Sequence, residues 1–104
     1  MAKRLELTPI AAPDDEREFS GVYIGDLLSW VMGRAKSGDI WITIMSNINI
    51  VAVASLADTA CIILAENVTV DENVRETAQM KGVNIYTTSL PAYETAAKLA
   101  ELLR

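Results

Sequence analysis

Few residues in this chain have side chains that could carry out catalysis. The sequence has no histidine, and its single cysteine, Cys61, lies within the apolar run ACIIL. This composition excludes Ser-His and Cys-His nucleophile pairs and the usual structural zinc sites. An all-carboxylate magnesium site is the one metal site left, and no paired-carboxylate motif marks it. We therefore expect a buried thiol, no catalytic residue, no resident metal and no cofactor that the residues themselves demand.

A set of short polar residues lies at the turns that follow the predicted strands. Its members are Asp26, Ser46, Asn47, Asn49, Glu66, Asn67 and Thr88. Ligands of open parallel α/β sheets bind beyond the carboxyl ends of the strands, where helix N-termini present free N–H groups. We expect these residues to form a ligand-binding site, with simple helix capping as the alternative for each of them.

The charges near these turns limit the ligand. None of the nine basic residues lies at the carboxyl end of a predicted strand, and neither GxGxxG nor GxxxxGK[ST] occurs. A triphosphate would therefore lack a cationic clamp. A neutral or weakly anionic polar ligand suits the set better.

The elements that must position these turns alternate between strand and helix, which predicts an α/β fold with a mainly parallel sheet flanked by helices. Strand patterns cover residues 4–10, 39–45, 60–64 and 83–88, and a strand passes into a helix within residues 21–39. Pro9 is expected to stop the first strand, and the alternation in 83–88 is typical of an edge strand. Further helices are predicted over residues 69–82 and 89–104, the second with Pro91 in its first turn.

Local signals define the helix ends and faces. Asp26 is expected to cap the first helix, whose buried stripe is Leu27, Leu28, Val31 and Ala35. Trp30 falls to one side of this stripe, next to Arg34, either at the edge of the core or as an exposed contact for a partner. Thr69 and Glu72 match a capping box, and Gly82 follows the end of that helix.

Residues 48–57 are ambiguous, because their β-branched side chains favour a hairpin while the surrounding alternation favours a helix. We predict a helix, with Ser46 and Asn47 as N-cap residues. Its apolar residues point in every direction, so we expect it to be buried on all sides. One face should pack on the sheet and another on a second subunit.

The length and composition of the chain fit one small domain. The chain has 104 residues with a net charge of -5, so a nucleic-acid partner is not expected. Its hydrophobic share of 51% exceeds what so short a chain can bury, which predicts a homodimer. The apolar runs are too short to span a membrane, and with a lone cysteine and no signal peptide we expect a cytoplasmic location. Residues 1–20 are expected to form an N-terminal strand and an acidic loop, and residues 21–104 the α/β part of a single structural domain.

Three stretches resemble one known family. GVYIGDLLSWVMGRAKSGDIWITI, NIVAVASLADTACIIL and GVNIYTTSLPAYETAAKLAELL, within residues 21–103, are similar to the DRTGG domain, above all to small stand-alone proteins of that type. Related domains lie beside CBS domains in some inorganic pyrophosphatases and resemble the N-terminal domain of HPr kinase/phosphorylase. The resemblance implies an α/β sandwich, a homodimer and a regulatory or ligand-binding role, and in the pyrophosphatases it implies adenine nucleotides as the effectors.

The letters that name the family are replaced in this chain. Asp-Arg aligns with Ser46 and Asn47, and Thr-Gly-Gly aligns with Ala65, Glu66 and Asn67. The scaffold therefore carries over better than a nucleotide site. From residues and resemblance together we expect a non-catalytic, ligand-sensing homodimer. The alternative is a protein-interaction adaptor that uses Trp30 or the acidic loop and needs no small-molecule ligand.

Overall fold

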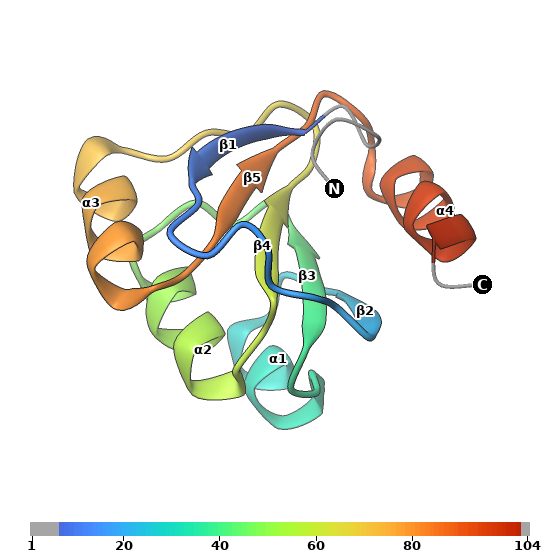
Figure 1. The fold of residues 1–104 in the computed structure, drawn as a ribbon, viewed down its shortest axis with the longest axis horizontal. Helices are drawn as coiled ribbons and strands as arrows, with labels where there is room; N and C mark the ends of the chain where they lie inside the picture. The colour runs from blue at the N-terminus through green and yellow to red at the C-terminus, as the bar shows by residue number, and fades with distance from the viewer. Residues whose placement is uncertain (1–6, 103–104) are drawn as a thin grey trace.

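The computed structural model describes residues 7–102 and shows one five-stranded sheet with four helices (Figure 1). The elements in chain order are β1 (Thr8–Ala11), β2 (Gly21–Ile24), α1 (Leu28–Arg34), β3 (Asp39–Thr43), α2 (Asn49–Ala57), β4 (Cys61–Leu64), α3 (Glu72–Lys81), β5 (Ile85–Thr87) and α4 (Ala92–Leu102). The sheet order is β1-β5-β4-β3-β2, and strands β2 to β5 are parallel. The predicted fold class is confirmed.

The helices cover the sheet unequally. Helices α1, α2 and α3 pack on one face, where Trp41, Ile62 and Ile85 of the central strands form the core. Helix α4 packs on the other face through Leu99, against Ile40 and other strand residues. Figure 1 shows α4 standing apart from the other three helices. This layering turns both faces of β3 and β4 into core, which explains their continuous apolar sequences.

Two strand predictions are corrected. Residues 83–88 do not form an edge strand, because β1 pairs antiparallel with β5 and covers that side. Pro9 does not stop β1 but lies within it, and the register is irregular between Pro9 and Ala11. Proline is tolerated there because β1 is itself an edge strand, which within residues 7–102 pairs with β5 alone. The predicted start of this strand at residues 4–6 lies outside the described residues.

Residues 49–57 form helix α2, so the helix prediction is confirmed. Its expected packing on the sheet is confirmed, and the expected packing of its other face on a second subunit stays a prediction. Val51 and Ala54 are 2% exposed against the core, whereas Leu56 is 73% exposed and Ile48 is 40% exposed. A helix lying on a sheet has an outer side whatever its composition, so this apolar side faces solvent in one copy of the chain.

The predicted caps of two other helices are wrong. Helix α3 begins at Glu72 with Asp71 at the N-cap position, so Glu72 is at N1, two positions before the N3 position that a capping box requires, and Thr69 is not the N-cap. Helix α1 begins at Leu28, and Leu27, expected in the buried stripe, is 57% exposed. Gly82 does end α3 as predicted, with the positive φ of 74° that glycine tolerates.

The predicted neighbours Trp30 and Arg34 do lie together, with the guanidinium carbon 3.8 Å from the centre of the indole ring. Trp30 is 51% exposed, so it belongs to the surface.

Within residues 7–102, no helix combines the length and the apolar character that a membrane crossing requires.

Candidate functional site

The ends of strands β2 to β5, with the turns that follow them, form what we call the carboxyl edge. Asp26 joins the first two of these turns. Its Oδ1 accepts hydrogen bonds from the hydroxyl of Thr43 at 2.7 Å and from the N–H of Ile44 at 3.0 Å. Asp26 is therefore not the cap of α1 that the sequence predicts, because its acceptor oxygen binds the turn after β3. It remains exposed at the edge.

The turns after β4 and β5 are joined by backbone hydrogen bonds. The N–H of Asn67 donates to the carbonyl of Thr88 at 2.7 Å, and the N–H of Glu66 donates to the carbonyl of Leu90 at 2.9 Å. Thr88 is 2% exposed, and its hydroxyl accepts from the N–H of Leu90. Thr88 therefore holds the turn together from inside, while the side chains of Glu66 and Asn67 face solvent.

Ser46, Asn47 and Asn49 lie around the start of α2, and all three are exposed. The Oδ1 of Asn47 accepts from the N–H of Asn49 at 2.9 Å, so its side chain bonds the start of α2 from one residue before the N-cap position, which is Ile48 and not the predicted Ser46 or Asn47. Ile48 has helical backbone angles and separates the two asparagines. Asn49 also lines a hollow on the outer side of α2, so its surroundings differ from those of the other edge residues.

The structure thus brings the predicted site residues to one edge in two bonded groups. One group is the pair of turns held by Asp26, and the other is the pair that includes Glu66, Asn67 and Thr88. Two carboxylates and several amide and hydroxyl groups face solvent there, so the edge can offer hydrogen-bond donors and acceptors. Among residues 7–102, no Lys or Arg lies in the turns that directly follow strands β2 to β5. Across the described residues, His, Cys, Asp and Glu side chains do not cluster in threes as a metal site would need.

Glu66 and Asn67 adopt left-handed backbone conformations, with φ of 57° and 64°. These are the two positions where the resemblance places glycines, and glycine is the residue that adopts such angles without a steric cost. We predict that Glu66→Gly raises the free energy of unfolding by up to about 1 kcal/mol. Urea unfolding measures this change. The control Glu72→Gly, at the start of α3, should lower stability instead, and a lower stability for Glu66→Gly would contradict the assignment of strain.

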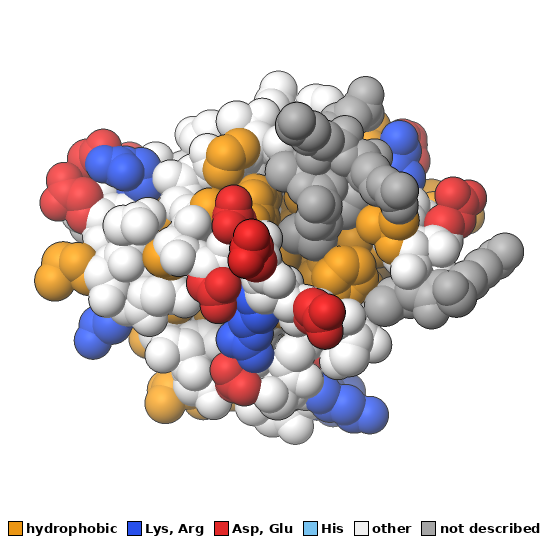
Figure 2. Space-filling model, in the orientation of Figure 1, with side chains coloured by type: hydrophobic (Ala, Val, Ile, Leu, Met, Phe, Trp, Pro, Cys, Tyr) orange, Lys and Arg blue, Asp and Glu red, His pale blue; other side chains and the backbone are white. Residues whose placement is uncertain are grey.

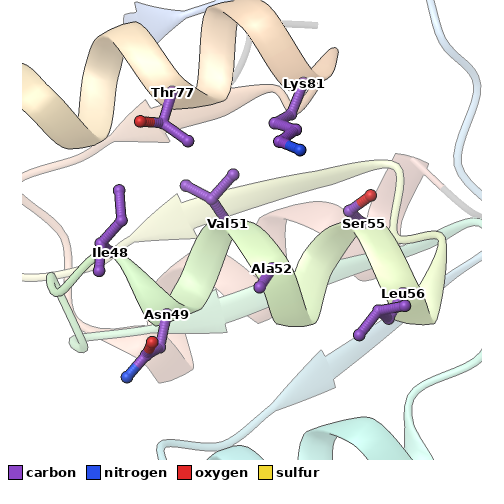
Figure 3. A pocket seen from close by; sticks show the side chains of 8 residues that line it. All are labelled: Ile48, Asn49, Val51, Ala52, Ser55, Leu56, Thr77 and Lys81. Atoms are coloured by element: carbon purple, nitrogen blue, oxygen red, sulfur yellow. The ribbon is translucent and has the colours of Figure 1, made fainter.

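A hollow of about 340 Å³ lies between the outer sides of α2 and α3, and we call it the α2–α3 hollow (Figure 3). It is lined by Ile48, Asn49, Val51, Ala52, Ser55, Leu56, Thr77 and Lys81. In Figure 3 the side chains of Thr77 and Lys81 point from α3 toward α2, and Val51 points toward α3. Apolar groups dominate the side formed by α2, which is the helix that the sequence assigns to a subunit contact.

The opposite end of the sheet carries a polar network that the sequence did not reveal. Asn84, 4% exposed, accepts from the N–H of Asp14 at 2.9 Å and donates to the carbonyls of Asp14 and Ala60 at 2.7 and 3.1 Å. It therefore fastens the acidic segment, residues 14–18, to the sheet. Figure 2 shows carboxylates around a basic side chain on this face, where the link from β1 to β2 crosses in Figure 1.

Asp58 joins the same network. Its carboxylate accepts from the Ser37 hydroxyl and forms an ion pair with Arg17 at 3.0 Å. The bond from Ser37, and then Arg17, lower the pKa of Asp58 below its ordinary value, so this carboxylate is ionised at neutral pH. The network fixes the acidic segment against the end of α2 and the starts of β4 and β5, which gives the segment a structural role.

Cys61 is 3% exposed beneath this segment, and burial raises the pKa of its thiol to about 12. The thiol is therefore neutral and inaccessible, as the apolar run around it predicts.

The sequence did not reveal the roles of Thr43, Thr87 and Asn84, which all hold turns or segments in place through hydrogen bonds. The available signal was a polar residue in or beside a strand that is otherwise apolar.

Comparison with known proteins identifies the family. The model of the DRTGG domain family matches residues 3–102, almost the whole chain, so this chain belongs to the DRTGG domain family. The match includes β1 and the acidic segment, which extends the predicted resemblance toward the N-terminus. No curated protein gives a significant match.

A solved structure shares the fold. It contains the CBS and DRTGG domains of the regulatory region of a Clostridium perfringens pyrophosphatase, in complex with the activator diadenosine tetraphosphate. The superposition has a TM-score of 0.78 with 16% sequence identity and covers 94% of this chain and 43% of the other. This chain therefore spans less than half of that regulatory region.

Proposed function

We propose that this chain is a non-catalytic regulatory domain that senses a small polar ligand at the carboxyl edge and acts as a homodimer. The observation that carries the proposal is the match to the DRTGG family over residues 3–102. The pyrophosphatase region with the same fold is described as regulatory and was solved with an activator. A regulatory role is thus a property of a protein that shares this scaffold.

The chemistry of the described residues supports a role without catalysis. A nucleophile needs a neighbouring base or a depressed pKa, whereas Cys61 is buried with a raised pKa. The sequence contains no histidine to act as a base. The hydroxyl of Thr43 donates to Asp26, but Thr43 is buried and the bond ties two turns together.

The carboxyl edge favours a ligand that offers hydrogen-bond donors and carries little negative charge. Asp26 and Glu66 contribute carboxylates, while Asn47 keeps its amide N–H groups available beyond the cap bond made by its oxygen. The resemblance adds adenine nucleotides to the candidates. A nucleoside fits these charges better than a nucleoside triphosphate, because no Lys or Arg follows strands β2 to β5 at this edge.

The outer side of α2 supports the homodimer. Ile48 and Leu56 are 40% and 73% exposed, and with Ala52 they follow one another at a spacing of four residues along one side of the helix. Exposed apolar residues that line a hollow are typical of an interaction surface. Val51 and Ala54 are unsuitable for testing this contact, because both are buried within the chain.

A thermal-shift screen with adenosine, adenine nucleotides and common metabolites tests the ligand. We expect at least one of them to raise the melting temperature in a saturable manner. Asn47→Ala should weaken binding of that compound and also lower the free energy of unfolding by about 1 kcal/mol through the lost cap. Isothermal titration calorimetry then gives the dissociation constant for both proteins.

The control variant is Thr77→Ala, on α3 and away from the carboxyl edge, which should leave ligand binding unchanged. A loss of stability in Asn47→Ala with unchanged binding would reduce Asn47 to a helix cap. A screen in which no compound shifts the melting temperature would contradict ligand sensing and favour the adaptor role.

A further inference from the structure

Strand β2 forms one edge of the sheet, and its outer side is open. Within residues 7–102 it pairs with β3 alone. The N–H of Gly25 donates to the carbonyl of Ile42 on the β3 side at 3.2 Å. Backbone groups alternate in direction along a strand, so those of Val22 and Ile24 face the open side. These groups can pair with a further strand.

A hollow of about 430 Å³ flanks the beginning of this strand, and we call it the β2 hollow. Residues 20–23 line it together with Arg34, Lys36, Ser37 and Asp39. The Asp39 carboxylate is turned inward, because its Oδ2 accepts from the N–H of Lys36 at 2.8 Å and its residue is 8% exposed. Arg34 and Lys36 are exposed and form no ion pair with any described residue. The hollow is therefore locally cationic on a chain with a net charge of -5.

Apolar side chains continue along the same side of the molecule. Ile24, Leu27 and Trp30 are 51%, 57% and 51% exposed, and Trp30 stacks with Arg34. Tryptophan and arginine are the residues that most often dominate the energy of protein interfaces. An open strand edge, two cations without an ion pair to any described residue and half-exposed apolar side chains thus occur together around β2 and α1.

We propose that the open edge of β2 binds an extended acidic segment of another protein, which adds to the sheet as a sixth strand. Its backbone pairs with Val22 and Ile24, its acidic side chains meet Arg34 and Lys36, and an apolar side chain packs on Trp30. This surface adjoins the carboxyl edge only at the end of β2 and does not include the outer side of α2. Its test uses Arg34, Lys36 and the outward N–H of Ile24, none of which belongs to the proposed ligand site or dimer contact.

A second copy of the chain fits this edge less well. Two β2 strands related by a two-fold axis would run antiparallel. The acidic segment of each copy precedes β2, so it would lie beyond the Ile24 end of the other copy, away from Arg34 and Lys36. Asp26 follows that end, but its Oδ1 is bonded to Thr43 and Ile44 of its own chain. Self-pairing would therefore offer the two cations one carboxylate, that of Asp26, whose Oδ1 is already bonded in its own chain, whereas an acidic segment supplies several.

The test uses a fluorescein-labelled heptapeptide, Asp-Glu-Val-Thr-Ile-Thr-Val, and the full chain. We expect saturable binding by fluorescence anisotropy, and slower amide exchange at Val22 and Ile24 when the peptide is bound. The double variant Arg34→Glu with Lys36→Glu should weaken binding by about tenfold or more, since it replaces attraction by repulsion. Ile24→Pro removes an outward N–H without touching a bond to β3, and it should weaken binding to a similar degree.

Two controls and three results decide the proposal. Arg75→Glu on α3, at the other side of the molecule, should leave the anisotropy curve unchanged, and a peptide with two lysines in place of its acids should not bind (Figure 1). Absence of saturable binding at millimolar peptide would overturn the proposal. Binding that depends on Arg34 and Lys36 but not on Ile24 would show charge attraction without strand addition. Self-association that Ile24→Pro abolishes would assign the edge to a second copy of the chain instead.

Discussion

Asn84→Ala is expected to lower the free energy of unfolding by about 2–3 kcal/mol, because it leaves buried polar groups without partners. Asn84 holds both the N–H and the carbonyl of Asp14 and the carbonyl of Ala60. Water can replace the bonds at exposed Asp14 but not readily the bond at Ala60, which is 4% exposed. Urea unfolding monitored by circular dichroism measures the loss.

A second effect of the same variant is local. Without Asn84 the acidic segment keeps its attachment through Arg17 and Asp58, an ion pair exposed to solvent and so worth little. Amide exchange across residues 12–20 should therefore quicken more than exchange in β3 and β4. Cys61, now beneath a looser segment, should react faster with a thiol reagent than it does in the wild type.

The matched control for Asn84→Ala is Asp14→Ala. Asn84 bonds the backbone of Asp14 and not its carboxylate, so removal of this side chain should change stability by less than about 0.5 kcal/mol. Equal losses in the two variants would show that the side chain of Asp14 matters and that the clamp is assigned wrongly. A loss near zero in Asn84→Ala would show that water substitutes at all three bonds.

Leu56→Glu is expected to convert a homodimer into a monomer at micromolar concentrations. Leu56 is 73% exposed in the single chain, so the change should cost little folding stability, within about 0.5 kcal/mol. In a two-fold contact each substitution occurs twice, and it places an unpaired carboxylate against an apolar surface. Ala52→Glu, one turn earlier on the same side of α2, should have the same effect. Sedimentation equilibrium measures the mass of both variants.

Tyr93→Glu is the control for the dimer. Tyr93 is 82% exposed on α4, which covers the opposite face of the sheet, so this variant should remain a dimer. A wild-type protein that is monomeric at high micromolar concentration would remove the homodimer from the proposed function. A dimer that survives both Leu56→Glu and Ala52→Glu would place the contact on another surface. Neither result bears on ligand binding at the carboxyl edge, which the thermal-shift screen tests separately.

Much of the architecture was determined by sequence alone. The alternation of strand and helix predicted the α/β class and assigned residues 48–57 to a helix against their β-branched composition, and the structure has this helix at Asn49–Ala57. These predictions succeeded because the apolar pattern and the number of residues between strands can be taken from the local sequence. In addition, two parallel strands that are neighbours in a sheet need a crossover connection, which is usually a helix. The family was identified separately, by the resemblance of stretches within residues 21–103, and the family match confirms it.

Only the tertiary structure decided the strand pairings and side-chain hydrogen bonds whose partners lie far away in the chain. The sequence of residues 83–88 predicts an edge strand, but in the structure β1, from the N-terminal part of the chain, pairs with β5 on that side. The sequence predicts that Asp26 caps a helix, but in the structure its Oδ1 accepts hydrogen bonds from Thr43 and Ile44, at the end of the next strand in the chain. The Asn84 clamp spans 70 residues, and no local pattern encodes it. The partners in such hydrogen bonds depend on which groups the fold brings close together. A buried polar side chain needs one of these partners, because burial without a hydrogen bond costs free energy.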